Sequence, residues 1–128
     1  SDDIENGLIA SIVTIASAEI LDDLLDQAKA YHKRNNREGS GILATAVFED
    51  TLRRIARASD IPEAGIKTDA IIAELDRKGL ISGVMAKRCR VAAGVRNHAL
   101  HAQWGSFSLD DIEDVMRITD QLIADLAK

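Results

Sequence analysis

Aliphatic side chains recur every three or four positions along most of this chain of 128 residues. That spacing places them on one face of an α-helix, where they can be buried together. Aromatic residues make up only 3% of the chain, and it contains a single proline. Because a core of leucine, isoleucine, valine and alanine with so few helix breakers favours helices over sheets, the sequence predicts an all-α fold.

Turn-forming residues divide the chain into five predicted helices, four long and one short. The segments are residues 4–35, about 40–59, 69–78, about 82–102 and from 108 onward. We expect neighbouring helices to run mostly antiparallel in a small up-and-down bundle. Residues 1–128 are of a length typical of a single domain. The chain begins with Ser1 rather than methionine, so it can be a fragment of a longer protein.

Polar residues with capping side chains precede four of these helices. Ser40, Thr68 and Ser82 stand where a side-chain oxygen can accept hydrogen bonds from free backbone N–H groups. Ser108 and Asp111 match the S-x-x-D form of the capping box. These residues predict where the second to fifth helices begin.

The second, third and last helices each have a predicted inward stripe. The residues of these stripes are Ala44, Phe48, Leu52 and Ile55, then Ile71, Ile72 and Leu75, and finally Ile112, Val115, Thr119, Leu122 and Leu126.

The chain is acidic, with a formal net charge of −5. An acidic protein is a poor non-specific binder of nucleic acid, so any such site must be a local basic patch. Cys89 is the only cysteine, which excludes an intrachain disulfide and suits a reducing compartment. The most apolar early run, Leu8–Ala18, is too short to span a bilayer. We therefore expect a cytoplasmic protein without membrane association.

One stretch of this acidic chain is basic. No aspartate or glutamate occurs between Asp76 and Asp110. The basic residues in the interval are Arg77, Lys78, Lys87, Arg88, Arg90 and Arg96. The pattern predicts a local patch on the fourth helix that a polyanion could contact.

The same helix contains the segment V-R-N-H-A-L-H-A-Q-W (Val95–Trp104), the richest in groups that bind phosphate or transfer protons. An arginine, an asparagine and two histidines fall within six consecutive residues. At about 100° per residue, Lys87, Arg90, Asn97 and His101 share a polar side of the helix. The predicted core face consists of Val84, Val91, Val95, Ala99 and Ala102.

Arg96 does not lie on the polar side with His101. The two residues are five positions apart and diverge by roughly 140° on an ideal helix. To serve one site, Arg96 must reach around the helix, the helix must distort, or a second protomer must complete the site.

Arg96 and Asn97, followed after three residues by His101, resemble the R-x4-6-H signature of HEPN domains. The surroundings are similar as well: a second helix containing A-V-F-E-D-T-L-R-R (Ala46–Arg54), a short third helix, the R-N-x-x-x-H helix and a final amphipathic helix. The resemblance covers the whole chain in the order of its elements. Its specific part consists of Arg96, Asn97 and His101.

This resemblance implies metal-independent cleavage of RNA by a homodimer, without a cofactor. The histidine of such domains is the general base or acid at the ribose 2′-hydroxyl and the leaving oxygen, and the arginine stabilises charge on the phosphorus. Histidine titrates near neutral pH, and arginine offers a fixed fork of donors to phosphate, so both residue types suit these roles. The resemblance assigns catalysis to Arg96, Asn97 and His101.

The predicted RNA-binding residues beside them are Lys87, Arg90 and His98. The roles implied are those of a toxin with an antitoxin or other partner protein, a phage-defence factor or an RNA-processing component.

Other interpretations of these residues remain open. Arg96 and Asn97 can be structural, for example by bonding Glu49 of the second helix, and His101 can serve only to complete a helix end. The chain is then a non-catalytic dimerisation or adaptor domain of a larger protein or complex. His98 and His101, together with His32, could also hold a metal, although the sequence does not fix the position of a third ligand.

Overall fold

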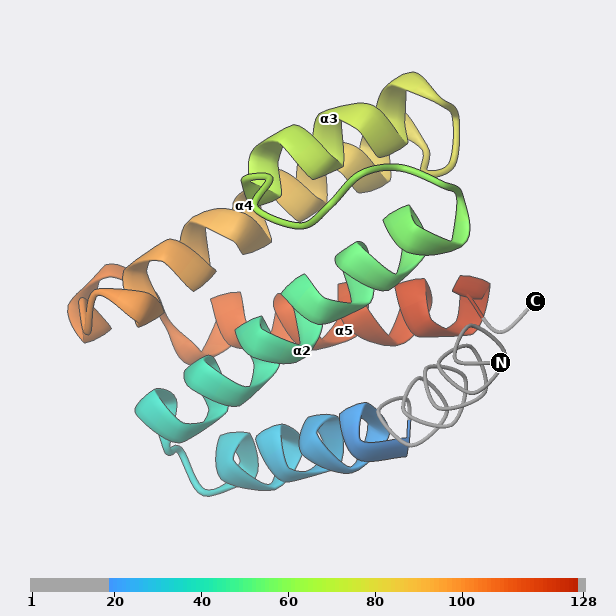
Figure 1. Ribbon diagram of the computed structural model, residues 1–128. Coiled ribbons are helices and arrows are strands. Elements are labelled where there is room, and N and C mark those ends of the chain that lie inside the picture. The colour runs from blue at the N-terminus through green and yellow to red at the C-terminus, as the bar shows by residue number, and fades with distance from the viewer. Residues whose placement is uncertain (1–18, 127–128) are drawn as a thin grey trace.

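The computed structural model describes residues 19–126, and these residues form helices and no strand (Figure 1). Residues 19–33 form the first described helix. It is followed by α2 (Arg37–Ala58), α3 (Thr68–Arg77), α4 (Gly83–Leu100), a short 3-10 helix η1 (Trp104–Ser106) and α5 (Leu109–Leu126). The predicted all-α fold is confirmed. The predicted first helix is confirmed over residues 19–33, and its beginning at residues 4–18 lies outside the described residues.

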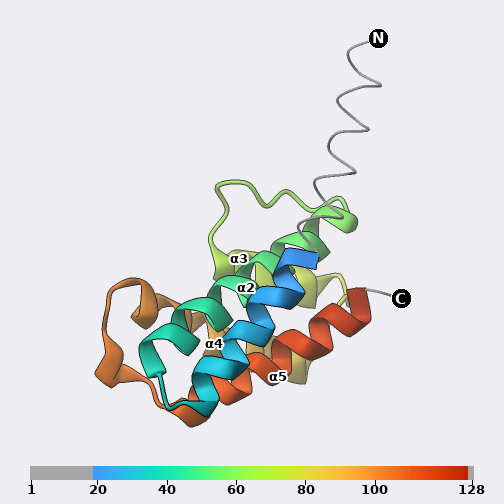
Figure 2. The same ribbon diagram turned by 90° about the horizontal axis from the view of Figure 1, so that it is seen from below.

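The four long helices alternate in direction, as expected of an up-and-down bundle (Figure 1). Helix α2 packs against both α4 and α5, and α4 packs against α3 and α5. Figure 2 shows the first described helix lying along α2 and α5. His32 on that helix bonds the Leu109 carbonyl at 2.8 Å, and Lys29 pairs with Asp120 at 3.0 Å. The short α3 covers the N-terminal half of α4, so the C-terminal half of α4 extends beyond it (Figure 1).

Most of the predicted inward residues of α2, α3 and α5 are buried. The confirmed positions are Ala44, Phe48, Leu52, Ile71, Ile72, Leu75, Ile112, Val115, Thr119 and Leu122. Ile55 is only partly buried, and Leu126 is exposed at the last turn of α5. Buried threonine hydroxyls are satisfied within their own helices, because Thr45, Thr51 and Thr119 each donate to the carbonyl four residues earlier at 2.7 Å.

Two of the predicted helix caps are confirmed. The Ser82 hydroxyl accepts a hydrogen bond from the backbone N–H of Met85 at 3.0 Å. Ser108 and Asp111 form the reciprocal capping box, with N–H to side-chain oxygen distances of 2.8 and 3.1 Å.

Two other cap predictions are wrong. Helix α2 begins earlier than expected, because the side chain of Asn36 caps it by accepting from the Gly39 N–H at 2.8 Å. Ser40 is therefore buried inside the first turn, where its hydroxyl donates to the Asn36 carbonyl at 2.6 Å. Thr68 is the first residue of α3 and not its cap, and its hydroxyl donates to Glu49 instead, at 3.0 Å.

The predicted core face of α4 is also largely wrong. Val84 and Val91 are 74% and 59% exposed, and Ala102 is exposed as well, whereas Val95 and Ala99 are buried as expected. The buried face is made of Met85, Ala86, Cys89, Ala92, Ala93, Val95 and Ala99. Small residues on this face let α2, α3 and α5 approach α4 closely, so the branched residues were a poor guide to its inner side.

The segment after α4 folds back onto the start of α2. Phe107 is buried against Gly41, where an added Cβ would lie 2.9 Å from a ring carbon of Phe107. Trp104 packs edge-on against Phe107 with ring centroids 6.2 Å apart. These contacts fix the chain that follows the C-terminal end of α4.

Candidate functional site

All six predicted site residues belong to α4 or to its C-terminal cap, His101. Lys87, Arg90, Asn97 and His101 are exposed, and Arg96 and His98 are partly buried. Arg96 faces α2, whereas His101 lies roughly 140° around the helix axis. No hydrogen bond joins the side chains of Arg96 and His101 within residues 19–126.

Arg96 is bound to a carboxylate of α2. Its Nε donates to Glu49 Oε2 at 2.6 Å, and the side chains of Arg96 and Glu49 are 25% and 18% exposed. The contact expected if Arg96 has a structural role is thus present. Short charged hydrogen bonds of this kind are among the strongest in proteins.

Glu49 is itself held from two further directions. Its Oε1 accepts hydrogen bonds from Thr68 Oγ1 at 3.0 Å and from Arg53 Nη2 at 3.1 Å. Arg53 also donates to the Ile66 carbonyl at 2.8 Å, which ties the loop before α3 to this cluster. Residues from α2, α3 and α4 thereby meet at one carboxylate.

The surroundings of Glu49 lower its pKa. Burial alone would raise the pKa, but hydrogen bonds from Thr68 and Arg53 and the charge of Arg96 outweigh it. The carboxyl is therefore ionised at neutral pH, and Thr68, Arg53 and Arg96 bind the carboxylate form.

Acidification should remove this contribution to stability. Since the pKa of Glu49 is lower in the folded chain than in the unfolded chain, its stabilisation is present at neutral pH and is lost as the pH falls through the folded value. We expect Glu49→Gln to lower the free energy of unfolding by about 1–3 kcal/mol at pH 7, and the difference to shrink below about pH 5. Urea denaturation of both proteins across this range measures it. A difference that grows on acidification would contradict the assignment.

The terminal nitrogens of Arg96 are available to a ligand. Within the described residues they make no hydrogen bond, and they are not sealed from solvent. The surface between Arg96 and His101 is open too. Leu100 and Asn97 project about 40° and 100° from Arg96 in the direction of His101. Leu100 is 64% exposed, and Asn97 is exposed.

The two neighbouring histidines differ in their contacts. His98 Nδ1 lies 2.8 Å from Gln103 Oε1. The imidazole of His101 makes no hydrogen bond within residues 19–126, although its backbone N–H bonds the Asn97 carbonyl. His101 is therefore the histidine whose ring is free for proton transfer.

The basic patch predicted on α4 is partly neutralised by carboxylates of other helices. The pairs are Arg88–Asp114, Arg90–Asp76 and Arg96–Glu49. The Arg90–Asp76 distance is 3.5 Å, and both residues are well exposed, so this pair is weak and can open for another anion. Lys87 has no carboxylate partner in the part of the chain that the structure describes.

The geometry gives little support to metal binding or to thiol chemistry. Among the described residues, no group of three histidine, cysteine, aspartate or glutamate side chains could hold a metal ion. Burial raises the pKa of the Cys89 thiol to about 11, against the opposing charges of Arg88 and Arg90, so this thiol stays protonated at neutral pH. None of the helices in residues 19–126 is long and apolar enough to cross a membrane.

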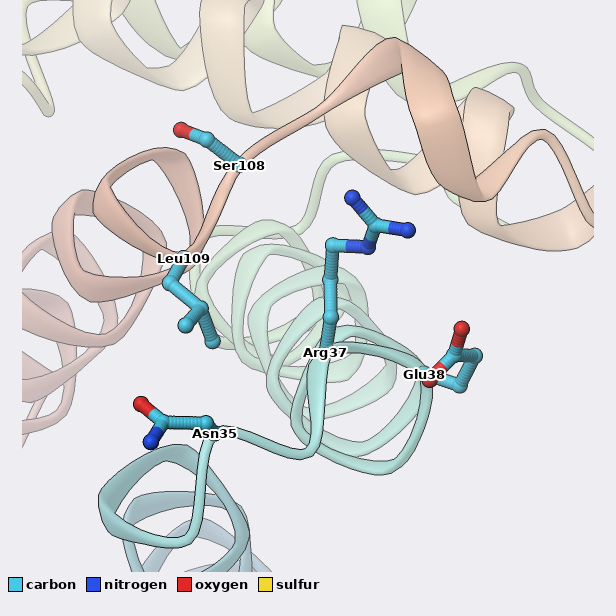
Figure 3. A pocket seen from close by; sticks show the side chains of 5 residues that line it. All are labelled: Asn35, Arg37, Glu38, Ser108 and Leu109. Carbon is cyan, nitrogen blue, oxygen red and sulfur yellow. The ribbon is translucent and has the colours of Figure 1, made fainter.

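A cavity of about 320 Å³ lies where α2 and α5 begin (Figure 3). Asn35, Arg37, Glu38, Ser108 and Leu109 line it, and none of these is a predicted site residue. Figure 3 shows the Arg37 side chain extending away from Asn35 and Glu38. Sequence patterns did not indicate this cavity, because its two sides are about 70 positions apart in the chain.

Comparison of the chain with models of protein families, with curated proteins and with solved structures produced no match. The likeness to HEPN domains therefore rests on Arg96, Asn97, His101 and the order of the elements.

Sequence patterns did not identify three residues that surround Arg96 in the structure. Thr68 was expected to cap a helix, Leu100 was not assigned, and Glu49 was considered only as a structural partner. A helical projection alone could have identified Leu100, since it falls between Arg96 and Asn97.

Proposed function

We propose that this chain is a HEPN-like domain that cleaves RNA without a metal or cofactor and that acts as a homodimer. The observation that carries the proposal is the open surface between Arg96 and His101, with Leu100 64% exposed at its centre. A second copy of the chain placed on this surface would cover Leu100.

A second copy of the chain would complete the site. Within one copy, Arg96 and His101 project roughly 140° apart from an ideal helix. The two side chains of one copy would therefore not contact the same RNA phosphate. Two copies of α4 related by a two-fold axis near Leu100 would bring the His101 of one copy toward the Arg96 of the other.

The chemistry assigned to each residue follows from its environment. His101, with a free ring, would take the proton of the ribose 2′-hydroxyl and return one to the leaving oxygen. Arg96 would bind the phosphate through its terminal nitrogens, and Asn97 would orient the reacting groups. Lys87, Arg90 and His98 would guide the RNA backbone along α4. Of these three, Lys87 has no carboxylate partner within residues 19–126.

The test compares RNA cleavage by the wild-type protein and two variants in the presence of a chelator. We expect cleavage by the wild type and a loss of about 10²–10⁴-fold in rate for His101→Ala and for Arg96→Ala. Lys33→Ala, an exposed change on the first described helix, is the control and should keep full activity. Absence of cleavage by the wild type, or its survival in both variants, would remove the nuclease proposal.

The biological setting proposed with this activity is cytoplasmic. A toxin with an antitoxin or other partner protein, phage defence and RNA processing all fit a nuclease of this kind. Growth arrest on expression, relieved by His101→Ala, would favour a toxin.

A second candidate is a non-catalytic dimerisation or adaptor domain. The observation that favours it is the 2.6 Å bond between Arg96 and Glu49, which gives the arginine a structural use. The adaptor and the nuclease both need a dimer, so the two are separated by RNA cleavage and not by oligomeric state.

A further inference from the structure

The two carboxylate oxygens of Glu49 have different hydrogen-bond donors. Oε1 accepts from Thr68 and Arg53, so the carboxylate is fixed by α3 and by its own helix. Oε2 accepts from Arg96 Nε at 2.6 Å. No other bond to Oε2 occurs within the described residues.

Only one edge of the Arg96 guanidinium takes part in this contact. Nε is bound, and the two terminal nitrogens remain without a partner in residues 19–126. A long arginine side chain normally samples many rotamers, and a bond at Nε removes the freedom of its outermost torsions. The remaining edge is the one that can receive two oxygens of a phosphate.

We infer that Glu49 is a positioning residue: it holds Arg96 by Nε so that the terminal nitrogens of the guanidinium are presented to an RNA phosphate. This inference rests on the proposed function, because it assigns Arg96 a phosphate ligand. Glu49 itself does not touch the RNA. Arg53 on the same helix binds Glu49 Oε1, so Glu49 keeps a charged partner when the Thr68 hydroxyl is absent.

A purely structural salt bridge predicts a different outcome. In that case Glu49 contributes to folding alone, and activity follows only the folded fraction of each variant. A positioning residue affects the chemical step at equal folded fraction, because a misplaced arginine stabilises the transition state less.

The experiment compares Glu49→Gln with Thr68→Val. Both changes remove a polar contact from the same cluster, but only Glu49→Gln removes the charge that holds Arg96. Arg96→Lys identifies the Arg96 Nε–H signal in ¹⁵N-labelled protein by its disappearance. Hydrogen exchange of that signal, kcat and KM for a single-stranded RNA, and the folded fraction are then measured for each variant.

We expect Glu49→Gln to speed exchange of the Arg96 Nε–H and to lower kcat by about tenfold or more, with a smaller rise in KM. Thr68→Val should keep kcat within about twofold of the wild type once the folded fraction is accounted for. Unchanged Nε–H exchange in Glu49→Gln would overturn the inference, and so would full kcat in a Glu49→Gln protein whose Nε–H exchange is fast.

The two proposals can fail separately. If the wild-type protein cleaves no RNA, the proposed function fails. The affinity of each variant for a single-stranded 2′-deoxy oligonucleotide is then measured in place of kcat. Weaker oligonucleotide binding by Glu49→Gln than by Thr68→Val would still support the positioning of Arg96 toward phosphate, and equal binding would end it.

Discussion

Leu100→Asp should convert the protein from a dimer into a monomer and abolish RNA cleavage. Leu100 is 64% exposed and lies between Arg96 and His101, so in the proposed dimer two leucines meet near the two-fold axis. Aspartate would place two carboxylates face to face there and would remove the apolar contact. We expect the dissociation constant to rise about 100-fold or more, which corresponds to about 2.7 kcal/mol.

Val84→Asp is the matched control for this substitution. Val84 is on the same helix and is 74% exposed, but it projects roughly 160° away from Leu100. It should leave dimerisation and cleavage unchanged. Sedimentation velocity over a range of concentrations measures the dissociation constants, and thermal unfolding checks that both variants fold. A wild-type chain that is monomeric throughout, or equal effects of the two substitutions, would count against the two-copy site.

Phe48→Ala should produce a large loss of stability. Phe48 is completely buried on α2, which packs against both α4 and α5. Truncation would remove most of an aromatic ring and leave a cavity that rigid helices fill poorly. A loss of about 3–5 kcal/mol is expected, a large part of the 5–15 kcal/mol typical of a domain.

Ile42→Ala is the control, because it makes a similar truncation on the same helix without changing the core. Ile42 is on the same helix but is exposed, so its truncation should change the free energy of unfolding by about 0.5 kcal/mol or less. Urea denaturation gives both values. A cost for Phe48→Ala close to that of Ile42→Ala would mean that α2 is not central to the core.

Periodicity predicted α2, α3 and α5 well because their buried faces carry large aliphatic side chains. The stripe that includes Ile112, Val115 and Leu122 stands out against polar neighbours. The same approach failed on α4, whose buried face is mainly alanine. Val84 and Val91 dominated the projection by size, yet neither is buried. Side-chain hydrophobicity cannot show which face has small residues selected for close helix contact.

The candidate site could be located on one helix from the sequence, but its electrostatics could not. The absence of acidic residues between Asp76 and Asp110 indicated a basic surface. The carboxylates that pair with it come from other helices, and Glu49 is 47 positions away from Arg96. Glu49 was one alternative considered for Arg96, whereas Asp114 and Asp76 become partners of Arg88 and Arg90 only through the packing of α5 and α3 against α4.

The buried threonines described above have a mechanical consequence. Thr45, Thr51 and Thr119 donate to carbonyls of their own helices, so their hydroxyls form no directional link to a neighbour. Thr68 is different, because it bonds Glu49 across two helices. Among the buried threonines of the described helices, Thr68 therefore gives a directional polar link between α2 and α3, and Thr45, Thr51 and Thr119 give none.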